Sequence, residues 1–518
     1  VPRRGLYGEA GGELTVKNLA IKLDNLLKKT PNALLCALGA VVFLLAFYFV
    51  SYRTPLSQVW LPTTMNNDEA IYNRQVVSVI EHGGPLGYFG YEEGHAAIGR
   101  YNTWGPFLIW AYAIPAFFFG SSVNVVLWCN LLFITLGIAF FARSAKLNVW
   151  QCIVLAGSLF AITIPLRSCV SGASEALHYL IAFVIVGSAA ALRRSGKTGW
   201  LIVLAAACAI ETIFRPYALL FWVFPLAAVW GDKRRRTACL ATAGVSFAVA
   251  VFAMTKLAAA FFSGTGMDFT GFSLLAQGHP FGAVGYMLTR AGKLLRYAWR
   301  DDILPTLQGP TTYIGGACVT FVIVLAVTLV CFVRDMRRGK PAALKGCALF
   351  CSVAVAAVLL TMYNIDPRHM SLVVLMMLGA IVAEDARPAA VYLPLLLVLL
   401  VPLNFQRGSL PEMNADMAAQ MEVVERELTA DLADAGSDPW DNTLAYAYDD
   451  NVFHGYLYAV PAGMGIEFDK NTYLWDAENP IYSRYVMCGH GTRVEERLQG
   501  DGWQPLFETN DLIVYKRP

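Results

Sequence analysis

Charge is scarce in this sequence. Of its 518 residues, 15% are Asp, Glu, Lys or Arg, whereas 56% are hydrophobic. Soluble globular chains carry about 25% charged residues, so this composition excludes an ordinary soluble protein. The formal net charge is +2, and no basic stripe interleaved with aromatic residues occurs outside the connecting segments. Nothing in the chain therefore indicates a nucleic-acid partner.

Motifs of metal, redox and nucleotide sites are also missing. No Cys-x-x-Cys pair occurs among the 11 cysteines, so neither a zinc site nor a redox motif is supported. The stretch Ser195-Gly196-Lys197-Thr198 resembles the end of a phosphate loop, but that motif needs a glycine where this chain has Ala191. We interpret the stretch as an ordinary basic loop.

Long apolar runs dominate the chain instead. Runs of about 17–25 apolar residues can cross a bilayer as helices, and these show no alternation that would indicate a barrel. They start near Ala33, Val123, Val149, Glu175, Trp200, Tyr217, Thr237, Thr311, Gly346, Met370 and Ala389. The predicted fold class is an all-α polytopic membrane protein with about 11 transmembrane helices. We expect the first run to be an anchor, because it is too long for a cleaved signal peptide.

Basic clusters set the predicted orientation, because cytoplasmic loops carry excess Lys and Arg. The clusters are Lys17 to Lys29, Arg143/Lys146, Arg193/Arg194/Lys197, Lys233 to Arg236, and Arg334 to Lys340. All of them lie inside only if the apolar stretch Gly105 to Gly120 does not cross. This stretch is short and contains Pro106 and Pro115. We therefore predict an interfacial helix there, in the first outer loop.

This topology divides the chain into three parts. Residues 1–32 form a cytoplasmic amphipathic segment, residues 33–404 the transmembrane domain, and residues 405–518 an extracytoplasmic domain. The long outer loops are 52–122 and 263–310. The last part reads as a small α/β domain, with helices at Glu412–Ala435 and Thr492–Gln499 and strands at Thr443–Tyr448, Arg484–Cys488 and Asp511–Tyr515. Cys169 and Cys488 fall on the same side, so a disulfide between them stays open.

The most informative polar segment is Asn66-Asn67-Asp68-Glu69, which follows the first anchor and begins a predicted helix running to Glu81. Acidic residues favour a helix N-terminus, so the simple interpretation is a helix cap. The functional interpretation is that one carboxylate accepts a proton from an attacking hydroxyl. Ionisable groups close to a membrane interior usually mark a site, and this makes Asp68 and Glu69 catalytic candidates.

The segment resembles a known family. Asn67-Asp68-Glu69-Ala70-Ile71-Tyr72, a spacer, and then Gly105-Pro106-Phe107-Leu108-Ile109-Trp110 leading to Phe119-Gly120 are similar to the first outer loop of GT-C glycosyltransferases. Within that superfamily the chain resembles the protein O-mannosyltransferases and lipid A aminoarabinose transferases. Members usually carry a double proline where this chain has Gly105-Pro106.

The resemblance implies roles for further residues. Asp68 would assist the acceptor, and Glu175 is the nearest match to a second acid in the next outer loop, although it could equally cap a helix. Arg215, and Arg368 in Asp366-Pro367-Arg368-His369, would meet the carrier phosphate; the alternatives are a structural arginine and a proline-initiated helix start. The remaining predicted substrate contacts are Tyr72, His95, Arg100, Tyr101, Lys293, Arg296, Arg300 and His369. The three residues of the third loop fit an interfacial helix on anionic lipid equally well.

The function implied is transfer of a sugar from a polyprenyl-phosphate carrier to a glycan, protein or lipid acceptor. Transfer would invert the anomeric centre, at the outer face of a bacterial plasma membrane. No cofactor is implied, and a divalent metal stays open. The alternative is a transporter or flippase for a lipid-linked cell-envelope precursor, although no internal repeat supports it. A third possibility is a receptor or scaffold that uses its outer domain.

Overall fold

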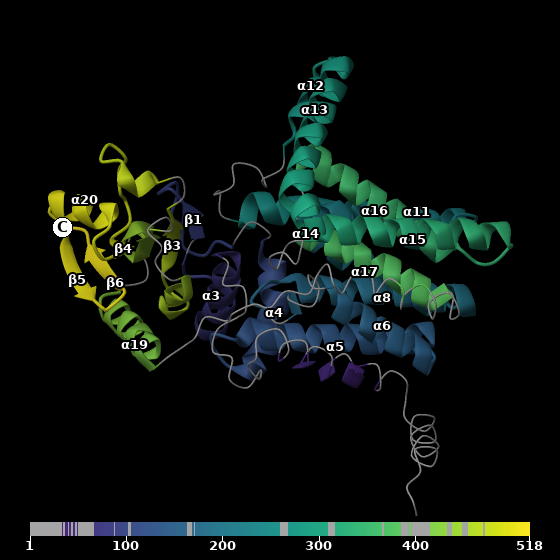
Figure 1. Ribbon diagram of the computed structural model, residues 1–518, viewed down its shortest axis with the longest axis horizontal. Coiled ribbons are helices and arrows are strands. Elements are labelled where there is room, and N and C mark those ends of the chain that lie inside the picture. The colour runs from purple at the N-terminus through teal and green to yellow at the C-terminus, as the bar shows by residue number, and fades with distance from the viewer. Residues whose placement is uncertain are drawn as a thin grey trace, which may run out of the picture.

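The computed structural model places a helical bundle beside a small sheet domain (Figure 1). It describes residues 67–87, 89–101, 105–162, 168–169, 171–258, 268–308, 316–364, 367–384, 415–432, 438–447, 454–469 and 472–518, with single positions within 34–49 and 392–395. The first predicted anchor and the run from Ala389 therefore lie largely outside the described residues.

The bundle follows the predicted apolar runs. Its helices are α4 (Pro106–Phe119), α5 (Val125–Ala145), α6 (Val149–Ala161), α8 (Glu175–Ser195), α9 (Thr198–Phe214), α10 (Val223–Val229), α11 (Lys233–Phe252), α15 (Ala317–Arg337), α16 (Ala343–Met362) and α17 (Pro367–Glu384). Among the described residues, five stretches are long and apolar enough to cross a membrane, namely α5, α8, Lys233–Leu257, α15 and α16. This confirms an integral, mostly helical architecture, while the total of about 11 crossings stays a prediction.

Glycines allow the central helices to approach closely. A Cβ atom on Gly187 of α8 would lie 2.2 Å from Ser144 Oγ of α5, and one on Gly137 of α5 would lie 2.9 Å from the Cα of Leu180. Small residues at helix crossings are typical of membrane bundles, because packing replaces the hydrophobic effect there. Helix α8 also packs on α9 and α17, so it forms the centre of the bundle.

Six strands of the described residues form one mixed sheet. They are β1 (Phe89–Tyr91), β2 (Thr443–Tyr446), β3 (Gly465–Phe468), β4 (Tyr485–Gly489), β5 (Gln504–Glu508) and β6 (Leu512–Lys516). Their order is β1-β3-β2-β4-β6-β5, with parallel pairing from β1 to β4 and antiparallel pairing from β4 to β5. Helix α19 (Ala415–Ala430) covers one face of the sheet and α20 (Arg493–Gly500) the other.

The edge strand β1 comes from the first loop and not from the C-terminal part. The next two residues, Glu92 and Glu93, have φ values of 56° and 53°, a conformation that costs energy outside glycine. This turn directs Glu93 into the domain, where its Oε2 accepts hydrogen bonds of 2.7 Å from the amides of Tyr482 and Ser483. The first loop is thereby fastened to the C-terminal domain.

Helix α3 (Asn67–His82) joins the two cores. Ala70 and Ile71 are buried with the sheet domain, whereas Tyr72 and Val76 are buried with the bundle. Acidic residues in its first turn and His82 in its last match the helix dipole. The predicted helix from Asn67 to Glu81 is confirmed, and it turns out to be shared by both units.

One open question is answered and one expectation needs correction. Cys169 and Cys488 are both free and buried, one in the bundle core and the other on strand β4, so they do not form a disulfide. The apolar run predicted from Tyr217 is divided into a 3-10 helix, η2 (Pro216–Trp222), and α10. Pro216 separates η2 from the preceding helix α9, which ends at Phe214. Strands β1, β3 and β5 were not predicted.

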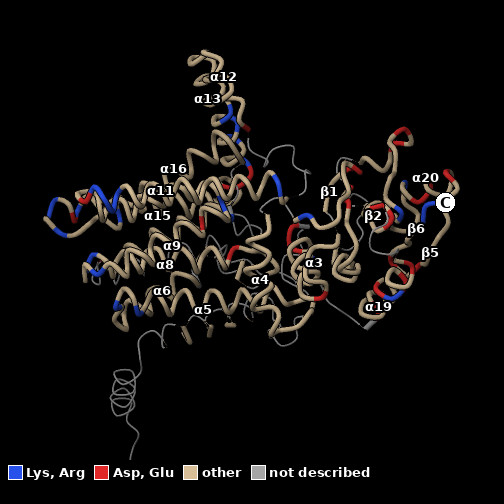
Figure 2. Tube along the Cα trace, turned by 180° about the vertical axis from the view of Figure 1, so that it is seen from behind, with Lys and Arg blue, Asp and Glu red and all other residues tan. Residues whose placement is uncertain are grey.

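The predicted third outer loop contains a helical hairpin. Helices α12 (Thr270–Ala276) and α13 (Pro280–Ala298) are followed by a π-helical turn, η4 (Trp299–Ile303), and by α14 (Leu304–Gln308). Figure 1 shows the hairpin projecting sideways from the bundle, across the direction of the long helices. In Figure 2, Lys and Arg gather at the bundle ends farthest from the sheet. That distribution matches the predicted basic side.

Candidate active site

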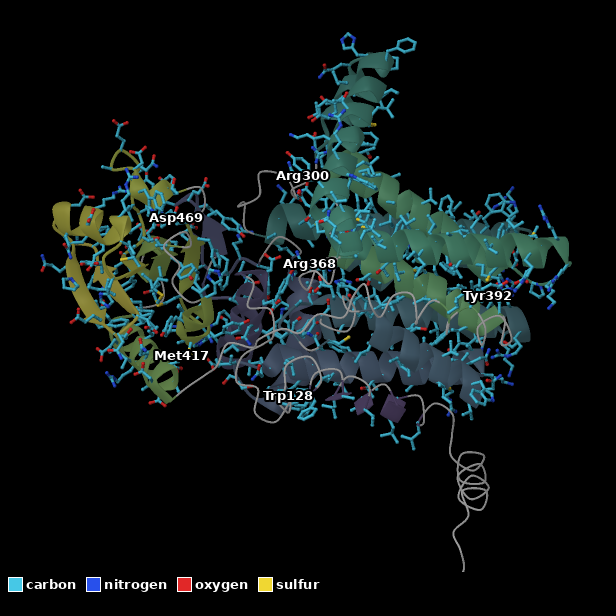
Figure 3. All side chains as sticks on the ribbon, in the orientation of Figure 1. Trp128, Arg300, Arg368, Tyr392, Met417 and Asp469 are labelled. Carbon is cyan, nitrogen blue, oxygen red and sulfur yellow. The ribbon has the colours of Figure 1, made fainter. Side chains whose placement is uncertain are left out.

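An ion pair lies at the junction between the bundle and the sheet domain. Asp68, in the first turn of α3, accepts a hydrogen bond of 3.0 Å at Oδ2 from Nη1 of Arg368. Arg368 follows Pro367, which begins α17, and Figure 3 shows it at the bundle end nearest the sheet. The side chain of Asp68 is 31% exposed and that of Arg368 is 22% exposed, so both remain accessible. Asp366 of the predicted motif lies outside the described residues.

Glu69 has a different environment from Asp68. It is 1% exposed, and its Oε2 accepts a hydrogen bond of 3.1 Å from the amide of Gly172. Burial raises the pKa of Glu69 to about 8, and the neighbouring Glu175 adds to this effect. Glu69 is therefore mostly protonated near neutral pH. Of the two adjacent carboxyls, Asp68 is the one that a substrate can reach.

Asn130 of α5 shapes the loop that meets Glu69. Its Nδ2 donates hydrogen bonds of 2.8 and 2.7 Å to the carbonyls of Ser171 and Ala173, and its Oδ1 accepts one of 2.6 Å from Tyr112. A Cβ atom on Gly172 would lie 3.0 Å from that of Glu69, so a larger residue would push the loop away. Neither Asn130 nor Gly172 was predicted.

A second ion pair lies deeper. Glu175 begins α8, and its Oε1 accepts a hydrogen bond of 3.0 Å from Nη2 of Arg215, at the end of α9. The other terminal nitrogen of Arg215 lies 3.2 Å from the Tyr217 hydroxyl and 3.0 Å from His369 Nδ1. Both charged side chains are almost fully buried. The predicted residues Glu175, Arg215 and His369 therefore form one network.

Sequence reasoning missed a third pair of ionisable side chains, which lies buried beside this network. His178 Nδ1 lies 2.8 Å from Glu211 Oε1, with side chains 1% and 0% exposed. His178 lies one helical turn after Glu175, and Glu211 one turn before Arg215, so the two pairs are stacked between α8 and α9. A signal was present, since ionisable residues inside apolar runs are rarely neutral to function.

Tyr72 belongs to the same site. Burial raises its pKa well above the ordinary value, and the carboxylates of Asp68 and Glu175 raise it further. Its hydroxyl is therefore a permanent donor beside the acidic residues. The structure thus brings together seven predicted positions: Asp68, Glu69, Tyr72, Glu175, Arg215, Arg368 and His369.

The other predicted contacts lie on different features. Arg100 donates a hydrogen bond to the carbonyl of Lys256, and the amide of Tyr101 donates one of 3.2 Å to that of Leu257. These bonds attach the first loop to the π-helical turn η3 (Ala253–Leu257), which follows α11. His95 lies in the same loop, between β1 and α4. Lys293, Arg296 and Arg300 lie on α13 and η4, in the projecting hairpin.

The chemical capacity of the site is acid–base and electrostatic. An accessible carboxylate stands beside an accessible guanidinium, with a second carboxylate–guanidinium pair behind them. Guanidinium groups bind phosphate with paired hydrogen bonds. Within the described part of the chain, no group of three or more His, Cys, Asp and Glu side chains forms a metal site.

Comparison with known proteins identifies the fold. No family model matches the chain, and no curated protein sequence does. Among solved structures, the crystal structure of ArnT from Cupriavidus metallidurans bound to undecaprenyl phosphate is similar, with a TM-score of 0.50 and 10% sequence identity. The match covers 93% of this chain and 97% of that one. ArnT is a GT-C aminoarabinose transferase, so the chain has the fold that its predicted resemblance implied.

Proposed function

We propose that the protein transfers a sugar from a polyprenyl-phosphate carrier to an acceptor hydroxyl. The observation that carries this proposal is the Asp68–Arg368 pair, an accessible base touching an accessible phosphate ligand. The pair lies where the bundle meets the sheet domain, in a fold shared with a protein crystallised with undecaprenyl phosphate. A lipid-linked donor can present its headgroup at this level while its chain stays in the bilayer.

Donor binding would prepare the base. The carrier phosphate competes with Asp68 for Arg368, because a phosphate offers the guanidinium a stronger, bidentate partner. Once Arg368 turns to the phosphate, the Asp68 carboxylate is released toward the acceptor. The donor thus activates the group that its transfer requires.

The chemical step then follows. The acceptor oxygen forms a bond to the anomeric carbon, while the bond from that carbon to the phosphate oxygen breaks. The leaving phosphate keeps the electron pair, and Arg368 stabilises its charge. The hydroxyl proton passes to Asp68. Because the acceptor attacks opposite the phosphate, the anomeric configuration inverts.

The deeper pair supports this step. Arg215 is held by Glu175, Tyr217 and His369, so its charge has a fixed position behind Arg368. We place it as a second source of positive charge for the phosphate. Glu175 fixes Arg215, and its Oε2 finds no hydrogen-bond partner within the described residues. Tyr72 supplies a hydroxyl donor toward the donor sugar.

The basic bundle ends support an extracytoplasmic site. Lys and Arg gather opposite the sheet domain, and such residues remain in the cytoplasm. The acceptor is then a glycan, protein or lipid outside a bacterial plasma membrane. The sheet domain, which packs directly on α3, lies where it can guide that acceptor.

The test is release of the carrier. Purified protein in bilayers is incubated with polyprenyl-phosphate sugars, and free polyprenyl phosphate is quantified with and without candidate acceptors. Acceptor-dependent release supports the proposal. Movement of intact donor between leaflets without cleavage would instead establish the flippase alternative. Neither cleavage nor movement, for a preparation that binds donor, would favour a receptor.

A further inference from the structure

We propose that the α12–α13 hairpin is a docking surface for anionic phospholipid in the leaflet on the sheet-domain side. The hairpin combines an exposed apolar stripe, a neighbouring basic stripe, and a base fixed at the bundle end. These three observations concern a part of the chain outside the Asp68 site.

The apolar stripe lies on α13. Phe281, Val284, Leu288 and Leu295 follow each other at helical spacing, and all four are exposed. Phe281 is 92% exposed and Leu288 67%. On α12, Phe272 and Leu275 are exposed as well. Exposed apolar surface of this continuity marks an interaction site.

The basic stripe identifies the occupant. Helix α13 carries Arg290, Lys293 and Arg296 and contains no acidic residue. Lys293 and Arg296 are exposed. Since each residue turns the helix by about 100°, Arg296 lies about 90° and Lys293 about 150° around the helix from the mean direction of the apolar stripe. Apolar side chains on one flank and cations on the next match the boundary between acyl chains and headgroup phosphates. Arg300, beyond the helix end, is already paired with Asp301 at 2.7 Å.

The base of the hairpin sets its depth. The amide of Asp268 donates a hydrogen bond of 2.6 Å to the carbonyl of Met362. Arg290 Nη2 donates one of 2.6 Å to the carbonyl of Tyr363. Arg290 also forms an ion pair of 2.8 Å with Asp268, so α13 and the residue before α12 are held together at the end of α16. Met362 ends α16, at the bundle end near the sheet. The hairpin therefore starts where the spans leave the bilayer.

The segment that follows α13 is also fixed at the bundle. Asp302 accepts hydrogen bonds from the amides of Gly316 and Cys318, at the start of α15. Figure 1 shows the hairpin extending across the long helices, and Figure 3 shows Arg300 at its base. Both chain ends of the hairpin are attached to neighbouring spans. Since the long helices cross the bilayer and the hairpin runs across their direction, the hairpin extends along the membrane plane. The apolar stripe of α13 can then contact lipid.

The test uses full-length protein in nanodiscs with one probe site at a time. Leu288→Cys lies on the apolar stripe, and Thr289→Cys lies on the basic flank as a matched neighbour. The cysteines among the described residues are buried, so an environment-sensitive fluorophore reacts preferentially with the new thiol. Each variant is first checked for monodisperse elution.

We expect probe fluorescence at position 288 to be shifted to the blue. Lipids with a shallow nitroxide should quench it at least severalfold more than at position 289, where aqueous iodide should dominate. Phosphatidylglycerol should strengthen the lipid quenching relative to phosphatidylcholine. The Lys293→Gln/Arg296→Gln pair should abolish that preference while the apolar contact persists.

Three outcomes would overturn the proposal. Equal access of iodide to both probes would show that the hairpin stands in water. Shielding of position 288 from both iodide and lipid nitroxide would show that protein covers the stripe. A response to undecaprenyl phosphate in phosphatidylcholine, with none to phosphatidylglycerol, would assign the basic residues to the donor.

Discussion

Arg368 Nη1 and Asp68 Oδ2 lie 3.0 Å apart although the two residues are 300 positions apart in the chain. The contact joins the first turn of α3 to the first turn of α17. The contact pairs both charges, and both side chains stay reachable. In the proposed function, a phosphate that takes the guanidinium would release the carboxylate, and this exchange would link donor binding to the base.

Asp68→Asn should leave the protein folded and able to bind donor, yet reduce transfer at least about a hundredfold. Asparagine keeps the size and the capping ability, but it cannot accept the proton, and loss of a general base costs about 10²–10⁴ in rate. Single-turnover release of polyprenyl phosphate measures the effect.

Glu69→Gln is the matched control for Asp68→Asn. Because the pKa of Glu69 is raised to about 8, its carboxyl is mainly neutral at pH 7, and glutamine resembles that form. We expect less than about a tenfold loss there, since glutamine can still accept the Gly172 hydrogen bond. A large loss in Glu69→Gln with near-normal Asp68→Asn would move the base to Glu69.

Arg368→Ala should weaken donor binding more than it affects the melting temperature, because the pair it breaks is partly exposed. Lysine should restore only part of the affinity, since it cannot form paired hydrogen bonds to phosphate. Titration with a fluorescent polyprenyl phosphate measures both variants. Unchanged affinity in Arg368→Ala would make this arginine a structural partner of Asp68.

Arg215→Ala should weaken donor binding and also destabilise the protein. It leaves the Glu175 carboxylate buried without its cation, and breaking such a pair costs about 3–5 kcal/mol. The double variant Glu175→Gln/Arg215→Gln removes both charges, so it should regain stability without regaining affinity. Recovered affinity in the double variant would limit Arg215 to a structural role.

The stability of the sheet domain should fall as pH rises. Burial and the adjacent Glu93 raise the pKa of Glu467 to about 9, so the folded state holds a proton that the unfolded chain loses near pH 4.5. The protonated carboxyl therefore stabilises fully below about pH 4.5, and this contribution is lost progressively up to about pH 9. Glu467→Gln should raise the melting temperature more at pH 8.5 than at pH 5.5.

The exposed Glu508 of β5 provides a control for this pH dependence. Glu508→Gln should change the melting temperature equally at both pH values. The same pH-dependent gain in both variants would mean that the gain does not arise from the burial of Glu467.

Helix α4 should not cross the membrane. Its 14 residues span about 21 Å, which is short of the roughly 30 Å hydrocarbon core. A cysteine replacing Lys146, at the end of α5, should then react with impermeant maleimide only after the cytoplasmic side is opened. Labelling of this position in intact cells would place α4 across the bilayer.

Candidate site residues could be predicted from the sequence where a charged residue type stands out from its local surroundings. Asp68, Glu175, Arg215 and Arg368 interrupt apolar runs or begin helices, and such positions are readable without contacts. Their pairing was not readable, because it depends on how α3, α8, α9 and α17 meet in space. Asn130 was missed for a related reason, since a single amide inside an apolar helix has no local pattern.

Strand β1 shows a different limit. Phe89-Gly90-Tyr91 is too short to display alternation, and glycine weakens the strand pattern further. Its partner β3 lies in the C-terminal part of the chain, and parallel pairing over such a distance leaves no trace in local composition. The sheet could be predicted as a domain, but not as one completed by the first loop.

Because α3 is buried in two cores at once, the helix that carries Asp68 is packed against both the sheet domain and the bundle. Ala70 and Ile71 hold it on the sheet side, and Tyr72 and Val76 on the bundle side. A displacement of the sheet domain relative to the bundle would therefore reach the first turn of α3, where Asp68 contacts Arg368. The length of this ion pair depends on how the two units are seated on the same helix.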